Sequence, residues 1–332
     1  MAFHHTHLPQ LAGQLFLTDG GLETTLIFRE GFTLPEFAAF TLLSYEAGYQ
    51  ALRAYFQTYA RLANTYQVGL ILESATWRAN PDWGAKLGYA PKILAEMNTQ
   101  AIQLLREIQA EYQTVHTPIV VSGNLGPRGD GYVPTTAMTA EQAQTYHQFQ
   151  IATLQGAGAE LITAMTINYV EEAIGIVRAA QAVGMPVVIA FTVETDGRLP
   201  TGQSLQAAIE AVDVATGQGP LYYMINCAHP THFAGILAPG APWVERIRGL
   251  RANASTMSHA EHNESETLDD GNPQELGDLY RELQASFPHI TILGGCCGTD
   301  DRHVEAICRA CLPVGWAALT NPLHQVRQSL GV

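Results

Sequence analysis

The chain has 332 residues, 47% of them hydrophobic, and a formal net charge of −14. A chain of this length and composition can bury a large core, and no composition break marks a boundary, so we expect a single domain over residues 1–332. The acidic charge argues against nucleic-acid or anionic-membrane partners, since these bind clustered cations. A small-molecule substrate fits better.

No apolar run approaches the roughly 20 residues needed to span a bilayer, and residues 1–10 are polar and histidine-bearing instead of signal-like. We therefore expect a cytoplasmic protein without a membrane partner. The five cysteines are an odd number in a large chain. This count argues against a disulfide framework and favours reduced thiols that bind metal or react.

Short apolar runs that end in a polar or glycine-bearing turn recur along the chain, and each is followed by a longer segment of helical periodicity. The predicted strands cover residues 15–19, 68–73, 118–124, 160–166, 186–194, 221–227, 247–253 and 290–296. The predicted helices between them include residues 44–64, 87–112, 139–155, 170–183 and 205–216. Eight such alternating units predict a (β/α)8 TIM barrel.

Barrel enzymes place their chemistry where strands end and the following loops begin. Polar residues stand at or next to these predicted strand ends: Asp19, Glu73, Asn124, Glu194, Cys227, Asn253, Cys296 and Cys297. Any one of them is more often a turn or helix-cap residue. The joint placement of three thiols at one mouth of the barrel favours a functional site.

The three thiols carry the strongest chemical signal. Cys296 and Cys297 lie within the run Gly-Gly-Cys-Cys-Gly-Thr, and Cys227 follows Asn226 at the end of an earlier apolar run. Neighbouring side chains alternate faces on an ordinary strand, but flanking glycines relax this limit and allow both sulfurs to face one ion. Three protein ligands with one vacancy is the arrangement of a catalytic zinc site. The alternative is a vicinal disulfide or simply buried apolar thiols.

The remaining cysteines and the histidines do not extend this site. Cys308 and Cys311 have a C-x-x-C spacing, but the helical periodicity of residues 304–312 predicts that both sulfurs lie on one face as small core side chains. No ligand spacing that we recognise joins the histidines at His4, His5, His7, His229, His232, His259 and His262. Of these, His229 and His232 follow Cys227 and are interpreted as solvated loop residues, with an outer role around the metal as the alternative.

Five motifs together resemble the homocysteine S-methyltransferase family. They are Asp-Gly-Gly-Leu-Glu-Thr at 19–24, Val-Ser-Gly-Asn-Leu-Gly-Pro at 121–127, Ile-Asn-Cys at 225–227, residues 249–254, and Gly-Gly-Cys-Cys-Gly-Thr at 294–299. A lone Asp-Gly-Gly or Cys-Cys would be weak evidence. The set stands in the family's order and spans residues 15–310, which makes it specific.

The resemblance implies a zinc ion held by Cys227, Cys296 and Cys297, a thiol acceptor, and an onium methyl donor such as S-methylmethionine or betaine. Homocysteine, which would give methionine, is the default acceptor. No catalytic side chain is expected beyond the substrate's own zinc-bound thiolate, and no organic cofactor. Substrate contacts are expected from Asp19, Gly20, Gly21, Glu73, Arg78, Asn124, Glu194 and Asn253.

Two departures from the family pattern bear on the acceptor. Met165 stands where family members that use homocysteine usually carry the glutamate that holds its amino group. Glu73 and Arg78 stand where neutral polar or aromatic residues are more usual. We expect Glu73 to take over the ammonium contact and Arg78 to receive a carboxylate. The alternative for this pair is a salt bridge within the loop.

Two other functions remain open at this stage. The same zinc barrel would suit a different methylated small molecule or another thiol, including a demethylase direction. The second alternative function is a non-catalytic protein that senses metal or thiols. Such a protein would not require so many charged side chains at the mouth of the barrel.

Overall fold

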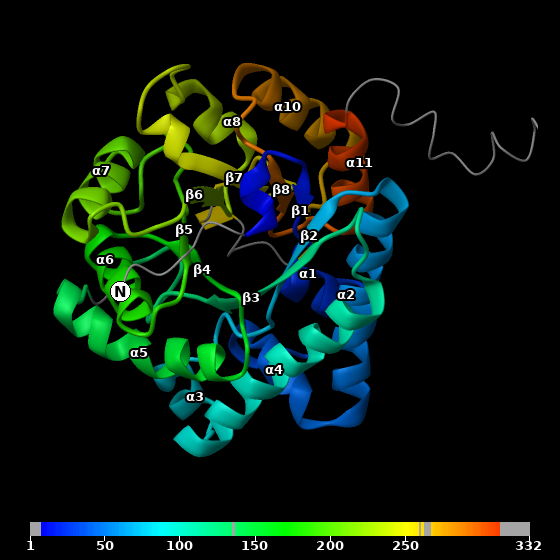
Figure 1. The fold of residues 1–332 in the computed structure, drawn as a ribbon, viewed down its shortest axis with the longest axis vertical. Helices are drawn as coiled ribbons and strands as arrows, with labels where there is room; N and C mark the ends of the chain where they lie inside the picture. Colours follow the sequence, from blue (N-terminus) through cyan, green and yellow to red (C-terminus); the bar gives the residue numbers. More distant parts are fainter. Residues whose placement is uncertain (1–7, 135–136, 259, 262–266, 313–332) are drawn as a thin grey trace, which may run out of the picture.

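The computed structural model describes residues 8–134, 137–258, 260–261 and 267–312. Eight parallel strands pair in chain order and close into a barrel between β8 and β1, with helices around it (Figure 1). The strands are β1 (Phe16–Leu17), β2 (Gly69–Glu73), β3 (Ile119–Leu125), β4 (Leu161–Ile167), β5 (Val187–Phe191), β6 (Tyr223–Asn226), β7 (Ile247–Ala252) and β8 (Ile292–Gly295). The predicted (β/α)8 barrel and its eight strands are confirmed.

The helices alternate with the strands. They are α1 (Leu22–Phe28), α2 (Glu46–Tyr66), α3 (Pro81–Lys86), α4 (Pro91–Tyr112), α5 (Ala140–Gly156), α6 (Val170–Ala182), α7 (Leu205–Thr216), α8 (Pro230–Phe233), α10 (Pro273–Ser286) and α11 (Asp301–Cys311). The five predicted helices correspond to α2 and α4 to α7. Their starts follow local signals: Pro91 opens α4, and Thr139 with Gln142 forms a capping box before α5.

Side chains that point into the barrel form an apolar layer and a polar layer. The apolar layer includes Phe16, Ile71, Val120, Leu161, Met165, Val188, Tyr222, Met224 and Ile292. The polar layer begins two residues later on several strands, as at Glu73 after Ile71 and Ser122 after Val120, since every second residue of a strand shares a face. Apolar side chains therefore fill the barrel interior toward the amino-terminal ends of the strands, and polar side chains line it toward their carboxyl ends.

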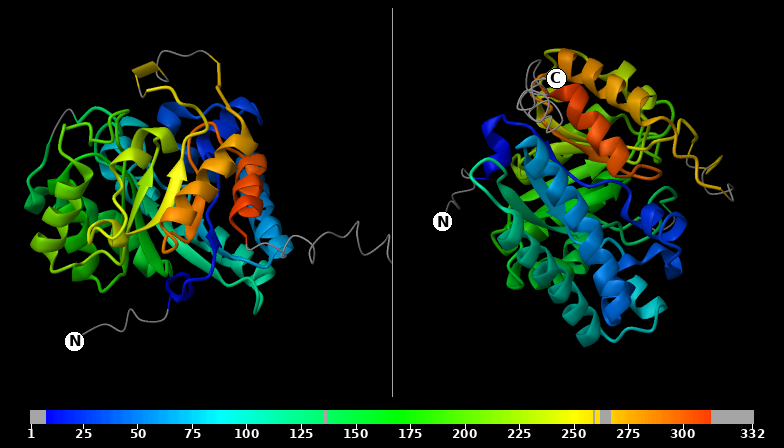
Figure 2. Two further views of the ribbon diagram at one scale, coloured as in Figure 1. Left: turned by 90° about the horizontal axis from the view of Figure 1, so that it is seen from above. Right: turned by 90° about the vertical axis from the view of Figure 1, so that its right-hand side faces the viewer.

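The two ends of the barrel are covered differently. At the amino-terminal end lies the short turn η1 (Pro9–Ala12), from which Leu11 packs against the apolar layer. At the opposite end lie α1, in blue, and the segment that follows β7, in gold (Figure 2, left). The carboxyl ends of all eight strands meet at this second end, which we call the mouth.

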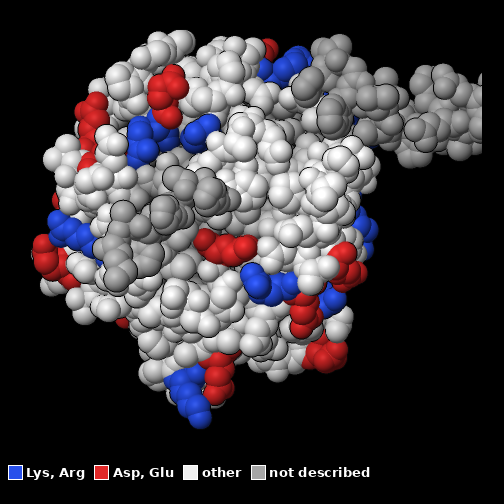
Figure 3. Space-filling model, in the orientation of Figure 1, with Lys and Arg blue, Asp and Glu red and all other residues white. Residues whose placement is uncertain are grey.

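Charged side chains of both signs are scattered over the described part of the face seen in Figure 3. Within the described part of the chain, no helix combines the length and apolar character needed to cross a membrane.

Gly175 on α6 offers a test of helix packing around the barrel. A Cβ there would lie 2.6 Å from the Gln144 nitrogen and 2.7 Å from the Ala140 oxygen of α5. Because backbone atoms cannot retreat as a flexible side chain can, Gly175→Ala should lower the free energy of unfolding by about 1–3 kcal/mol in urea denaturation. Gly156→Ala is the matched control, because no atom lies within 4 Å of its added Cβ. It should be neutral or stabilising by up to about 1 kcal/mol, and equal losses in both variants would contradict this packing.

Candidate active site

Three cysteines converge at the mouth. Cys227 follows β6, and Cys296 and Cys297 follow β8. Their sulfur atoms all lie within 4.8 Å of one another. Among the described residues, these three cysteines form the cluster that could hold a metal ion. The convergence predicted from the strand ends is confirmed.

Cys227 is aimed by its neighbours on β4 and β6. Its backbone has a left-handed φ of 55°, and so does Thr166 with φ of 61°, which is rare for a β-branched residue. The Asn226 side chain holds Thr166 from both sides: its Oδ1 accepts from the Thr166 N–H at 2.9 Å and its Nδ2 donates to the Thr166 hydroxyl oxygen at 2.9 Å. The Thr166 hydroxyl in turn lies 3.9 Å from the Cys227 sulfur. Strained backbone of this kind clusters at functional sites.

The loop after β8 carries the other two thiols. The Cys296 N–H donates to the Ala252 carbonyl at 2.8 Å, which ties the loop to β7. Gly298 has φ of 78°, a conformation that glycine adopts without strain, and its N–H donates to the Thr24 hydroxyl at 3.2 Å. The predicted need for glycine beside the two cysteines is thus met at Gly298, where the chain turns back.

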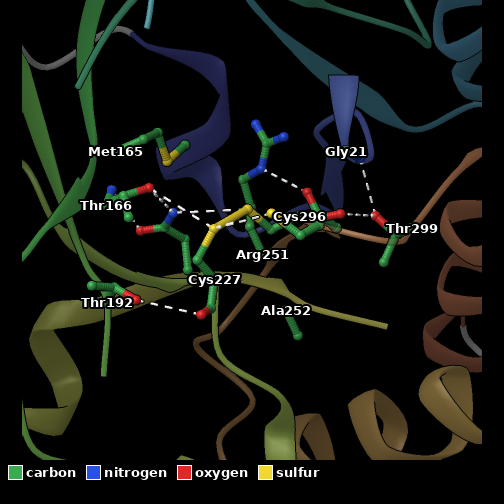
Figure 4. The surroundings of a disulfide bond; sticks show 12 residues. Gly21, Met165, Thr166, Thr192, Cys227, Arg251, Ala252, Cys296 and Thr299 are labelled. Carbon is green, nitrogen blue, oxygen red and sulfur yellow. Dashed lines mark hydrogen bonds between the residues drawn. A yellow bond between two sulfur atoms is a disulfide. The ribbon is translucent and has the colours of Figure 1, made fainter. Parts of the chain in front are cut away.

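Cys227 and Cys296 are joined by a disulfide, with their Cα atoms 5.5 Å apart (Figure 4). The expectation of reduced thiols is wrong for this pair, and so is the alternative of a vicinal disulfide between Cys296 and Cys297. The physical reason is the convergence itself, since sulfurs close enough to share a metal are also close enough to bond. The Cys297 sulfur is free and lies 3.9 Å from that of Cys227.

The donor set fits zinc once the disulfide is reduced. Thiolate sulfur is a preferred zinc ligand, and three such ligands leave the fourth tetrahedral position for substrate. Burial raises the pKa of the Cys297 thiol, whose sulfur lies 3.8 Å from the Tyr132 hydroxyl. A metal cation would reverse this effect, because it stabilises the ionised ligand.

A buried cation, Arg251 of β7, organises the charges beside the cysteines. It pairs with Asp19 at 2.7 Å and with Glu73, both almost fully buried. It also donates to the backbone oxygens of Gly20 and Gly295, each at 3.0 Å. Burial raises the pKa of both carboxyls, whereas the neighbouring guanidinium acts in the opposite direction. Arg251 therefore joins the ends of β1, β2, β7 and β8.

The Glu73 carboxylate is paired with Arg251. Its predicted contact with a substrate ammonium group stays a prediction. The alternative of a Glu73–Arg78 salt bridge is wrong. Arg78 instead stacks between two indole rings, with its guanidinium carbon 4.1 Å from the Trp77 centroid and 3.9 Å from the Trp83 centroid. One of its nitrogens donates to the Gly129 carbonyl at 2.9 Å, and burial lowers its pKa.

The other predicted substrate residues lie around the same mouth. Gly21 packs closely, since a Cβ there would come within 2.5 Å of the Cys296 carbonyl oxygen. The side-chain oxygens of Asn124 and Asn253 are buried, and within the described residues neither has a hydrogen-bond partner. Glu194 instead lies in a turn, where its carbonyl accepts from the Gly197 N–H at 2.9 Å. Their substrate contacts remain predictions.

Met165 lies at the mouth end of the apolar layer, with 5% of its surface exposed. Figure 4 shows it near the paired sulfurs, beside Thr166. Its side chain offers no charge, so the strand position that we aligned with the family's glutamate is apolar in this protein.

The thiols and histidines set aside earlier are mostly accounted for. Cys308 is fully buried in the outer core and Cys311 packs against it, which confirms their structural role. His229 is only 6% exposed, so its interpretation as a solvated residue is wrong; it caps α8, and burial lowers its pKa to about 4. His232 contacts the Thr256 carbonyl at 3.0 Å. His4, His5, His7, His259 and His262 lie outside the described residues.

Three residues of the site were not predicted: Arg251, Tyr132 and Glu23. Arg251 stands two positions before Asn253 at the end of a strand, so the strand-end rule extended to it would have found it. Tyr132 lies in the glycine-bearing loop after β3, and Glu23 in the first turn of α1. No local pattern marks Tyr132, because only the closed barrel brings it to the cysteines, whereas Glu23 stands inside the motif at 19–24.

Comparison with known proteins identifies the family. The sequence matches the family profile described as Homocysteine S-methyltransferase over residues 16–311. The chain belongs to the homocysteine S-methyltransferase family. This membership confirms the resemblance drawn from the five motifs, and it makes the protein a methyltransferase.

Solved structures of homocysteine methyltransferase MmuM from Escherichia coli share the fold. The oxidized form is 20% identical with a TM-score of 0.70, and the match covers 89% of this chain and 95% of MmuM. The metallated form is 18% identical with a TM-score of 0.71, covering 90% and 96%. At this identity the likeness to MmuM shows a common barrel fold only. The substrate of this protein has to be inferred from its own residues.

Glu23 offers a test of the electrostatics at the mouth. Burial raises the pKa of its carboxyl from 4.5 to about 7. Because the pKa of the Glu23 carboxyl is higher in the folded state than in the unfolded state, its contribution to the free energy of unfolding is fully present below pH 4.5 and is lost as the pH rises through 7. Glu23→Gln should therefore gain stability relative to wild type by about 1–3 kcal/mol between pH 5 and pH 8, measured by urea unfolding. Glu30→Gln, at an exposed position after α1, is the control; a difference between Glu23→Gln and wild type that does not change with pH would contradict the burial effect.

Proposed function

We propose that this protein is a zinc-dependent S-methyltransferase that moves a methyl group from an onium donor to a thiol, with homocysteine as the default acceptor. The observation that carries the proposal is the convergence of three sulfurs within 4.8 Å at the carboxyl end of the barrel. Family membership supplies the reaction class. A cytoplasmic location remains an expectation.

Cys227, Cys296 and Cys297 would hold the metal after reduction of the disulfide. A zinc ion held there would supply a Lewis acid, which would keep an acceptor thiol, whose free pKa is about 8.5, in the thiolate form at neutral pH. The thiolate sulfur then forms a bond to the methyl carbon, and the methyl–onium bond breaks with its electron pair leaving on the donor. Opposite charges meet and neutral groups result, so no proton needs to be moved in the transfer itself.

The protein's own part is alignment, because the reaction requires sulfur, methyl carbon and leaving group in line at near-attack distance. Asp19 and Gly20 are held by Arg251 and by the Tyr55 hydroxyl, which donates to the Asp19 carboxylate at 3.0 Å. This bracing fixes the turn that packs against the cysteine loop through Gly21. The free side-chain oxygens of Asn124 and Asn253 add acceptors for a donor group on substrate.

A thiol other than homocysteine is the second candidate acceptor, and Met165 is the observation that favours it. A carboxylate at the corresponding position in the family holds the amino group of homocysteine. With an apolar side chain there, the protein either rejects the amino group or binds it with another residue. Direct binding measurements with a series of thiols distinguish these outcomes.

The first test of the proposed function is metal content. Reduced, purified protein should carry about one zinc per chain, and Cys296→Ala should remove most of it, because two remaining thiolates make a much weaker site. Elemental analysis of dialysed protein measures this ratio. Cys308→Ala is the matched control, since that sulfur is buried in the core away from the mouth, and it should keep its zinc. Full retention in the alanine variants of all three predicted ligands would overturn the proposal.

The second test concerns acceptor binding. Zinc-loaded protein should show three sulfur neighbours around the metal by X-ray absorption spectroscopy, and addition of the true acceptor should raise this number to four. The rise follows from the vacancy that three protein ligands leave. An acceptor that is methylated while the number of sulfur neighbours stays at three would refute direct thiolate coordination.

A further inference from the structure

Each of the three sulfurs at the mouth lies beside a side-chain hydrogen-bond donor. These contacts pair Thr166 with Cys227 at 3.9 Å, Asn226 with Cys296 at 4.0 Å and Tyr132 with Cys297 at 3.8 Å. A cysteine that binds metal does so as the thiolate, which has no proton to donate. In a metal-bound site the Tyr132 hydroxyl is therefore the donor and the Cys297 sulfur the acceptor.

Tyr132 reaches its sulfur from a different part of the fold than the other two donors. Thr166 and Asn226 lie on β4 and β6 and are bonded to each other, so the strands that form the barrel also fix these side chains. Tyr132 lies between β3 and α5, and residues 128–132 belong to no strand or helix. Its position must therefore be fixed by side chains.

Three buried polar side chains hold the backbone of residues 128–132. They are Arg78, Asn168 and Glu172, with 8%, 1% and 1% of their surface exposed. Their bonds run from the Arg128 N–H to Glu172 at 2.7 Å, from Arg78 to the Gly129 carbonyl at 2.9 Å, and from the Asn168 Nδ2 to the carbonyls of Asp130 and Gly131 at 3.0 and 2.9 Å. Burying polar groups costs free energy unless they are hydrogen-bonded, and all three direct such bonds at this one segment. The backbone that carries Tyr132 is thereby held beside the cysteine loop.

We propose that Tyr132 is a positioning residue for the metal site: its hydroxyl donates a hydrogen bond to the Cys297 thiolate and adjusts that sulfur as a zinc ligand. The proposal rests on the proposed function, because it requires a metal on the three cysteines. A hydrogen bond to a thiolate withdraws charge from the sulfur, which then donates less charge to the metal. More Lewis acidity is left for the acceptor sulfur at the fourth position, and the direction of the Cys297 side chain is fixed.

The test uses reduced protein loaded with Co²⁺ or Zn²⁺, without methyl donor or acceptor. Tyr132→Phe removes the hydroxyl and keeps the ring. In the cobalt form, the sulfur-to-metal charge-transfer absorption should move to longer wavelength, because a sulfur without the hydrogen bond gives up an electron more readily. Zinc affinity, measured by competition with a chromophoric chelator, should fall about 10- to 100-fold, because the buried thiolate loses a group that stabilises it.

Tyr146→Phe is the matched control. It also removes a hydroxyl that is hydrogen-bonded, but this hydroxyl donates at 2.8 Å to Asn80, the residue that caps α3. The control should leave the cobalt absorption and the zinc affinity unchanged. Asn168→Ala should shift the absorption in the same direction as Tyr132→Phe and have little further effect when the two are combined, because both act through one contact.

The cobalt absorption separates this role from a structural one. If Tyr132→Phe lowers the unfolding midpoint or the amount of bound cobalt but leaves the absorption of the fully loaded protein unchanged, the proposal is overturned and the proposed function stands. An equal shift in Tyr146→Phe contradicts it as well. If reduced wild-type protein binds neither Co²⁺ nor Zn²⁺, the proposed function fails and the role of Tyr132 with it.

Discussion

The pairing of Arg251 with two buried carboxylates is the interaction on which the mouth of this barrel depends. One guanidinium contacts Asp19 and Glu73 and the backbone oxygens of Gly20 and Gly295. Burial alone would lower the pKa of the arginine, but the two carboxylates outweigh it and keep the group charged. Removing one member of such a buried set leaves an uncompensated charge, at a cost of about 3–5 kcal/mol. The strands that bear the Asp-Gly-Gly turn and the cysteine pair are thereby held in one arrangement.

This bracing also explains how neighbouring thiols can face a common point. Two backbone hydrogen bonds tie the cysteines to β7. The Cys227 N–H donates to the Arg251 carbonyl at 3.1 Å, and the Cys296 N–H donates to the Ala252 carbonyl at 2.8 Å. One strand thus positions both sulfurs, while its arginine side chain reaches the neighbouring strand ends. The left-handed backbone of Cys227 and Thr166 is tolerated because these surrounding contacts over-determine it.

The carboxylates at the mouth differ in how they are held. Asp19 and Glu73 are paired with Arg251, whereas the hydrogen bond that lowers the pKa of the Glu23 carboxyl comes from the backbone. Met165 on β4 presents an apolar side chain, and Glu23 lies in the first turn of α1. Family membership describes the reaction class.

Much of this protein can be predicted from local sequence. The alternation of apolar strands with amphipathic helices predicts the barrel, because periodicity is a property of neighbouring residues, and the placement of Cys227, Cys296 and Cys297 at strand ends predicts their convergence once the barrel is assumed. The helix α10 agrees with the expectation that a helical segment follows each apolar run, since Leu276, Tyr280 and Leu283 have helical spacing. The short helix α1 carries too few residues for any period to be read.

Only the tertiary structure decided which charges pair. Sequence placed Glu73 and Arg78 in one loop and suggested that they act together, yet Glu73 pairs with Arg251, far away in the chain, and Arg78 stacks between Trp77 and Trp83. Pairing depends on distances across the closed barrel, and side chains from β2 and β7 meet inside it only after all eight strands have closed. The same closure joins Cys227 to Cys296. The strand ends were determined by sequence, and the partners of the residues they carry were determined by the fold.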